Sequence, residues 1–179
     1  VSGKLLGENL HLIVNHWPSR RGGEKKSAPK RIAAADLGRS IIDSLLAADP
    51  EAKIMLMGDL NDDPVDVSIK KHLKTVGEKE KIKSALLFNP MESLYKKGVG
   101  SLAYRDSWNL FDQIIISTSL IKEQQHAFRY YTAKVFNKNF IMQQDGQYKG
   151  YPFRTFVGNT FQGGYSDHFP VYMFLVKEK

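Results

Sequence analysis

The chain has 179 residues, of which 42% are hydrophobic and 25% charged; this fits one domain with one sizeable core and excludes a disordered chain. It contains no cysteine, which excludes disulfides, thiolate catalysis and cysteine-based zinc sites, and no apolar run has the length of a transmembrane segment. With 26 Lys and Arg against 19 Asp and Glu the net charge is +7, which favours an anionic partner or merely gives a solvated surface.

The first predicted element is a strand at residues 9–16. Leu10 and Leu12 would lie on one face and Ile13 on the other, so we expect the strand to be buried on both sides. The chain opens on Val1, only a short glycine-containing turn before this strand. We therefore expect that an N-terminal portion of the fold precedes Val1.

A basic loop and a helix are predicted next. Residues 19–31 carry six basic residues and two glycines, which is typical of a mobile loop. Ser27 and Pro29 are helix-start signals, and apolar residues then recur at helical spacing as far as Asp49. A second strand follows at residues 54–57. This strand, helix and strand form the βαβ pattern of layered α/β proteins.

The rest of the chain predicts short elements and a final strand. A short helix is expected at residues 65–73, followed by a lysine-rich segment that continues to Lys83 and is usually a solvated helix face. Strands are predicted at residues 101–104, 108–117 and 127–135, and in the apolar run that ends at Val176. Residues 145–164 are predicted to form a surface excursion.

Several polar residues lie in or at the end of the apolar strand-like runs, where an unpaired polar group is costly. They are His16, Asp59, Asn61, Asp112, Asp167 and His168. Taken singly, each has a purely structural explanation, such as a turn or a satisfied core histidine. Their shared position at strand ends predicts a common site.

A calcium-binding loop is the competing interpretation of one of these segments. Asp59, Asn61 and Asp63 match its first three ligand positions. The sixth and twelfth positions require glycine and a bidentate acid, but they hold Pro64 and Lys70. This interpretation is therefore excluded.

Four motifs in order carry a resemblance to a known family. They are Asn15-His16-Trp17-Pro18-Ser19-Arg20, Gly58-Asp59-Leu60-Asn61-Asp62, Trp108 with Asp112-Gln113-Ile114, and Ser166-Asp167-His168-Phe169-Pro170-Val171. Together they resemble the endonuclease/exonuclease/phosphatase superfamily, with the DNase I-like fold, and within it an uncharacterised bacterial branch. The resemblance covers essentially the whole chain, as one domain over residues 1–179.

The resemblance implies an α/β fold in which two sheets form a sandwich with outer helices. The chain resembles the C-terminal half of that fold. The implied activity is hydrolysis of a phosphodiester or phosphomonoester by in-line attack of water, dependent on Mg²⁺ or Mn²⁺. A nuclease and a small-molecule or lipid phosphatase both fit.

The resemblance also assigns roles to residues. Asp59 would orient and deprotonate the attacking water, and Asn61 would donate to a phosphate oxygen. Asp59 is also implied as a metal ligand.

His16 and His168 would flank the phosphate. Asp112 would accept a hydrogen bond from His168 and keep it protonated. Asp167 would bind the metal or support its ligands.

Substrate contacts remain more open. Arg20 could bind a nucleic-acid backbone while Trp17 or Tyr165 stacks on a base, and Arg154 with the turn at residues 162–164 could form a substrate rim. The alternatives are a solvated loop, a core position for Trp17 and glycines that only make a turn.

The chain departs from the family pattern in one respect. The family has an asparagine, a metal-binding glutamate and an acidic partner of the first histidine upstream of the strand at residues 9–16, and these have no place here. We therefore expect the chain alone to be a poor enzyme, with an exposed apolar sheet face that favours self-association. A non-catalytic phosphate- or nucleic-acid-binding module is the alternative function.

Overall fold

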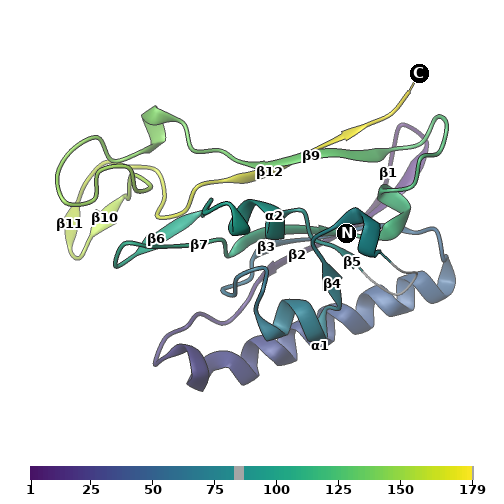
Figure 1. The fold of residues 1–179 in the computed structure, drawn as a ribbon, viewed down its shortest axis with the longest axis horizontal. Helices are drawn as coiled ribbons and strands as arrows, with labels where there is room; N and C mark the ends of the chain where they lie inside the picture. The colour runs from purple at the N-terminus through teal and green to yellow at the C-terminus, as the bar shows by residue number, and fades with distance from the viewer. Residues whose placement is uncertain (83–86, 179) are drawn as a thin grey trace.

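A mixed six-stranded sheet forms the centre of the computed structural model, which describes residues 1–82 and 87–178 (Figure 1). Its strands, in spatial order, are β1 (Ser2–Leu5), β2 (Glu8–His16), β3 (Lys53–Asp59), β8 (Asp112–Ile116), β5 (Leu87–Phe88) and β4 (Thr75–Val76). The pairs β2–β3 and β4–β5 are parallel, and the other neighbours are antiparallel. The parallel pair β2–β3, joined by a helix, confirms the predicted βαβ unit.

The other strands form three antiparallel pairs within the described residues. They are β9 (Arg129–Val135) with β12 (Val171–Val176), β6 (Leu102–Tyr104) with β7 (Ser107–Asn109), and β10 (Phe156–Val157) with β11 (Thr160–Phe161). The helical segments are α1 (Glu24–Ala48), α2 (Met91–Lys96), a π-helical turn at Ser68–His72, and 3₁₀ turns at Lys79–Lys81, Thr118–Leu120 and Asn139–Ile141.

Helix α1 covers one face of the central sheet (Figure 1). Ala35 and Ile42 of the helix pack against Ile54 and Leu56 of β3 in a fully buried core. Gly38 permits this close contact, because a Cβ there would lie 3.1 Å from the Leu56 side chain. Burial of such side chains stabilises the layer by roughly 1.5–3 kcal/mol each.

The β9–β12 ribbon covers the opposite face of the sheet, so the molecule is a sandwich (Figure 1). Met173 and Leu175 of β12 pack on Ile114 and Ile116 of β8. The outer face of the ribbon is different, since Tyr131 is 68% exposed and Phe174 52% exposed. Self-association through this apolar face stays a prediction. Sedimentation velocity tests it by measuring whether the chain is a monomer.

Three predicted elements differ in the structure. The first residues form β1 rather than only a turn, and the predicted strand 108–117 is split into β7 and β8 at Leu110 and Phe111. The split follows from side-chain and backbone bonds to another loop, because the Leu110 amide donates to Asp63 and the Phe111 carbonyl accepts from Leu60. The predicted helix 65–73 is limited to the π-helical turn, and Lys83 lies outside the described residues.

The predicted basic loop is also shorter than expected, because α1 already begins at Glu24. Pro29 lies inside the helix, where it lacks a backbone donor. Arg31 offsets this local cost, since its buried guanidinium bonds Ser27 Oγ and the Glu24 and Pro18 carbonyls. Arg31 thus joins the first turn of the helix to the segment that precedes it.

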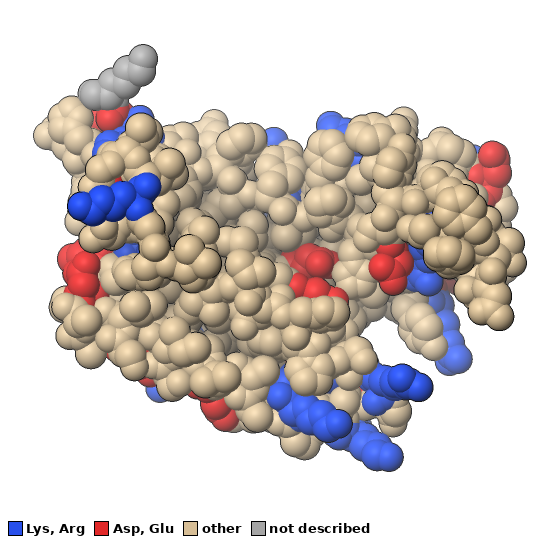
Figure 2. Space-filling model, turned by 180° about the vertical axis from the view of Figure 1, so that it is seen from behind, with Lys and Arg blue, Asp and Glu red and all other residues tan. Residues whose placement is uncertain are grey.

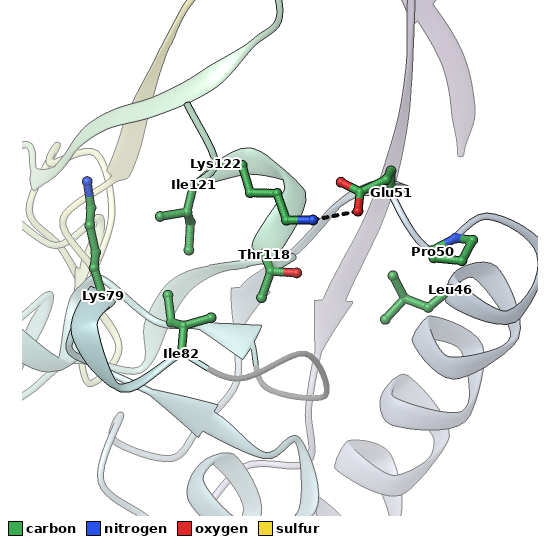
Figure 3. A pocket seen from close by; sticks show the side chains of 8 residues that line it. All are labelled: Leu46, Pro50, Glu51, Lys79, Ile82, Thr118, Ile121 and Lys122. Atoms are coloured by element: carbon green, nitrogen blue, oxygen red, sulfur yellow. Dashed lines mark hydrogen bonds and ion pairs between the residues drawn. The ribbon is translucent and has the colours of Figure 1, made fainter. Parts of the chain in front are cut away.

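A cavity of about 570 Å³ lies away from the motif residues (Figure 3). Leu46, Ile82 and Ile121 point into it, and a Lys122–Glu51 ion pair lies at its edge (Figure 3). It adjoins the beginning of β3, whereas Asp59 ends this strand. No helix among the described residues is both long and apolar enough to cross a bilayer.

Candidate active site

Three strands bring their polar ends together at one edge of the central sheet. His16 at the end of β2 pairs in register with Asp59 at the end of β3, which in turn lies opposite Asp112 at the beginning of β8. His16 Nε2 lies 3.4 Å from Asp59 Oδ2, and the His16 side chain is 76% exposed. The structure therefore gathers three of the predicted residues in one row, with His16 open to a ligand.

Gly58 makes the close approach of β2 and β3 possible at this row. Its φ is +135°, and a Cβ there would lie 1.9 Å from the carbonyl oxygen of Asn15. No side chain fits this space, so glycine is required immediately before Asp59.

His168 reaches the same row from the segment before β12. Its Nδ1 lies 2.7 Å from Asp112 Oδ2, as the resemblance implies. Burial lowers the pKa of His168, but the hydrogen bond and charge of Asp112, together with Asp59 and Asp167, outweigh it and raise the pKa above its ordinary value. Burial raises the pKa of Asp59, although the Asn61 amide and both histidines lower it.

Asp59, Asp112 and His168 can each offer a metal-ligand atom, and these atoms lie within 4.8 Å of one another. Two carboxylates are the hard oxygen donors that Mg²⁺ takes, so the donor set fits this ion. Asp167 is exposed and lies outside this group of three. Its role as a metal ligand stays a prediction.

Asn61 is held tightly behind Asp59. It adopts a φ of +51°, its amide N–H donates to Asp59 Oδ1 at 3.0 Å, and its side-chain Nδ2 donates to the Trp17 carbonyl at 3.0 Å. Asparagine tolerates this left-handed conformation better than most residues. One of its two Nδ2 hydrogens is thus used in fixing the loop, and the predicted bond to phosphate stays a prediction.

Two predicted substrate contacts are corrected by the structure. The Trp17 side chain is only 3% exposed and packs in the core, so it cannot stack on a base. Arg20 lies over the Phe111 ring and is bound by the Asn61 carbonyl, by Glu24 at 3.1 Å and by three carboxylates of the loop after β3. Those carboxylates belong to Asp62, Asp63 and Asp66, at 3.2, 3.6 and 2.7 Å. Arg20 positions the loop after β3 and does not face a substrate.

Sequence reasoning missed a second arginine in the same network. Arg31 Nε lies 2.6 Å from Asp62 Oδ1, and both residues are buried. Asp62 Oδ2 accepts from Ser68 and its carbonyl accepts from Gln113. Two features of the sequence could have indicated this network. They are the adjacent acids Asp62 and Asp63, and Gln113 within an apolar strand.

Burial has its clearest electrostatic effect on Asp63. It raises the pKa of this carboxyl from 3.8 to about 6, although the Leu110 amide and Arg20 lower it. Burial also raises the pKa of Asp66 in the same loop. Asp62, Asp63 and Asp66 thus outnumber the two arginines that they contact.

The other predicted substrate residues lie on the surface beside the site. Tyr165 is 66% exposed and contacts the rings of Phe140 and Phe153. Gly164 lies against the Phe153 and Arg154 carbonyls, where a Cβ would come within 2.4 Å of either oxygen. This glycine therefore allows close backbone packing.

Acidic side chains lie at the middle of the face in Figure 2, and basic ones gather below and beside a hollow.

Comparisons with known proteins agree with this fold. A sequence model described as the Endonuclease/Exonuclease/phosphatase family matches residues 1–177, whereas no curated protein matches the chain. A humanized D. rerio TDP2 with 14 mutations has a TM-score of 0.56 and 14% identity, over 98% of this chain and 58% of that one.

Two further solved structures share the fold. The mannosyl-6-phosphatase of Bacteroides thetaiotaomicron has a TM-score of 0.53 and 18% identity, over 96% of this chain and 52% of that one. A Staphylococcus aureus beta toxin double mutant with bound magnesium ions has a TM-score of 0.54 and 13% identity, over 97% of this chain and 55% of that one. The chain thus spans little more than half the length of these structures. Its DNase I-like α/β sandwich and the match over residues 1–177 show that the chain belongs to the endonuclease/exonuclease/phosphatase family.

Proposed function

We propose that the chain carries the site of a Mg²⁺-dependent phosphoesterase, which hydrolyses a phosphodiester or phosphomonoester by attack of water. Its family and fold support a hydrolase of phosphate esters in general. The observation that carries the proposal is the meeting of Asp59, Asp112 and His168 within 4.8 Å at the ends of separate segments.

Asp59 is suited to accept the proton of the attacking water. Its Oδ1 is fixed by the Asn61 amide, so Oδ2, next to the exposed His16 ring, remains for a water molecule. Partial burial raises the pKa of Asp59 and thereby makes the carboxylate a stronger base than a solvated aspartate. His16 donates to the phosphate from the side of β2.

Asp112 holds His168 in one orientation by its bond to Nδ1, so Nε2 is the atom that donates to phosphate. The raised pKa keeps this imidazole protonated, and the positive charge opposes the charge that develops on the phosphate oxygens. Asp59 and Asp112 would hold Mg²⁺, with Asp167 as the additional predicted ligand. When bound, the ion neutralises phosphate charge and stabilises the leaving oxygen.

A direct test compares the chain with Asp59→Ala on bis-p-nitrophenyl phosphate, p-nitrophenyl phosphate and plasmid DNA, with and without Mg²⁺. Loss of the general base should lower the Mg²⁺-dependent rate by about 10²–10⁴-fold. Asp145→Asn, which changes an exposed aspartate far along the chain, is the matched control and should leave the rate unchanged.

The outcomes separate the candidate functions. A Mg²⁺-dependent rate that Asp59→Ala leaves unchanged would contradict the proposed site. Phosphate or DNA binding without any hydrolysis would favour the non-catalytic binding module. If DNA is the substrate, its binding should weaken steeply with added salt, because phosphate contacts release counterions.

A further inference from the structure

A second cavity, of about 430 Å³, lies between the β6–β7 hairpin and the excursion that carries β10 and β11. These segments occupy the same end of the molecule (Figure 1). The side chains that give the cavity its chemistry are Tyr104, Arg105, Asp106, Tyr148, Tyr151 and Arg154. Two guanidinium groups and three phenol rings thus surround one space.

The positive charge of this cavity is only partly balanced. Arg154 is half-buried, and within residues 1–82 and 87–178 its one hydrogen bond goes to the Ala103 carbonyl at 3.5 Å. Arg105 contacts the Tyr104 ring at 5.2 Å, and neither arginine pairs with a carboxylate in this part of the chain. A half-buried guanidinium with unused donors is a ready partner for a phosphate or carboxylate.

Asp106 supplies the carboxylate among the described residues that line the cavity, and it is already engaged. Its Oδ1 accepts from the Tyr151 hydroxyl at 2.5 Å, and its amide N–H donates to the Tyr151 hydroxyl oxygen at 3.0 Å. These two bonds connect the hairpin to the excursion and hold the cavity together. Asp106 therefore stabilises the wall of the cavity, and the two arginines are the groups that can bind an anion.

Aromatic rings supply the remaining wall. Tyr151 contacts Tyr148 at 5.7 Å, and Tyr104 and Tyr148 expose much of their surface. A planar or ring-shaped group next to an anion can lie on such faces while the arginines bind the charge.

Both walls of the cavity contact the segment that carries His168. On the hairpin side, Trp108 lies between Tyr151 at 5.7 Å and Phe169 at 6.0 Å, and Phe169 follows His168. On the excursion side, the Phe153 carbonyl next to Arg154 accepts from the amides of Tyr165 and Ser166, which lie three and two residues before His168. The walls of the cavity are thus packed against the segment that carries His168.

We propose that this cavity binds a second anionic group of the substrate, a phosphate attached to a ring, while the scissile phosphate occupies the Asp59–His168 site. The proposal rests on the proposed function of that site and narrows its substrate to molecules with two phosphate groups. A nucleotide unit and a sugar bisphosphate share this chemistry.

Binding can be measured without turnover by isothermal titration calorimetry in EDTA. The probes are thymidine 3′,5′-bisphosphate and glucose 1,6-bisphosphate, each compared with its monophosphate. One charge-assisted contact should make the bisphosphate bind about tenfold or more tightly. Arg154→Gln should abolish this advantage and leave monophosphate binding unchanged, and Arg154→Lys should restore part of it. The probe for which the bisphosphate binds more tightly, relative to its monophosphate, shows whether the cavity prefers a nucleoside or a sugar.

Arg129→Gln on β9 is the matched control and should preserve the advantage. An advantage that survives in both Arg154→Gln and Arg105→Gln would overturn the proposal, as would equal binding of bisphosphate and monophosphate by the wild type. Because no metal is present, the result is independent of hydrolysis. A lost advantage in Arg154→Gln combined with full activity of Asp59→Ala would leave the cavity proposal standing and refute the proposed function.

Discussion

Arg20 and Arg154 both lie next to aromatic rings beside the candidate site, yet the structure uses them in opposite ways. Arg20 contacts Phe111 and is surrounded by carboxylates, whereas Arg154 lines a cavity together with three tyrosines and bonds a single carbonyl. Residues 59–66 contain four aspartates, but residues 137–165 contain only Asp145. The local supply of carboxylates therefore decides whether an arginine fixes the protein or remains available to a ligand.

The same contrast separates the two segments that frame the site. The loop after β3 is held by buried ion pairs and hydrogen bonds, which fix Asp59 and Asn61 in position. The excursion is bonded mainly through its backbone, and it exposes aromatic side chains such as Phe156 and Phe161. One side of the site is rigid for chemistry, and the other presents surface for recognition.

The largest effect is expected from Arg31→Ala. Removing this guanidinium leaves the buried Asp62 carboxylate without its closest cation, and such a change typically costs about 3–5 kcal/mol of unfolding free energy. Urea denaturation followed by circular dichroism measures it. Arg21→Ala, an exposed arginine in the same segment, should change the free energy by no more than about 0.5 kcal/mol. Equal losses in both variants would show that the loop is not held in this way.

A smaller, kinetic effect distinguishes the two arginines directly. Arg20→Gln should lower kcat by about ten- to hundredfold with little change in KM, because a loosened loop misplaces Asp59. Arg154→Gln should instead raise KM for a bisphosphorylated substrate. Steady-state kinetics at saturating Mg²⁺ measures both, and thermal melting checks that each variant is folded. A raised KM with unchanged kcat in Arg20→Gln would mean that this residue binds substrate after all.

A third expected effect is a dependence of stability on pH. The folded-state pKa of Asp63 is about 6, above the value of 3.8 for an unfolded aspartate, so folding favours the protonated carboxyl. The stability that this proton contributes is complete below about pH 4 and is lost as pH rises through 6. Asp63→Asn should flatten the fall in unfolding free energy between these pH values. An unchanged slope in urea titrations would contradict the raised pKa.

The sequence was a good guide to what lies at the strand ends. His16, Asp59, Asp112 and His168 follow or begin apolar runs, and in-register pairing brings the first three into one row as expected. The Asp112–His168 bond was implied by the family resemblance and is present. Strand position is a local pattern, so it can be seen before any tertiary contact is known.

The errors arise where distant residues decide the outcome. The segment from Glu24 to Arg31 looks like part of a loop because of its basic residues and the glycines before it, but Asp62 binds Arg31 and the segment is helical. Trp17 and Arg20 were predicted to contact a nucleic acid, yet Trp17 packs in the core and Arg20 binds carboxylates of the loop after β3. Neither result follows from periodicity or composition, because burial depends on the loop that arrives after β3.

The in-register row of His16, Asp59 and Asp112 has a further consequence for biosynthesis. During translation these three residues emerge well before His168, and the ring that Asp112 will hold is still to be made. The sheet and α1 can pack in the meantime, since most of their contacts lie within the earlier part of the chain. The candidate site is therefore completed only when the segment preceding β12 has been synthesised, so the nascent protein remains chemically incomplete until nearly all of this sequence is made.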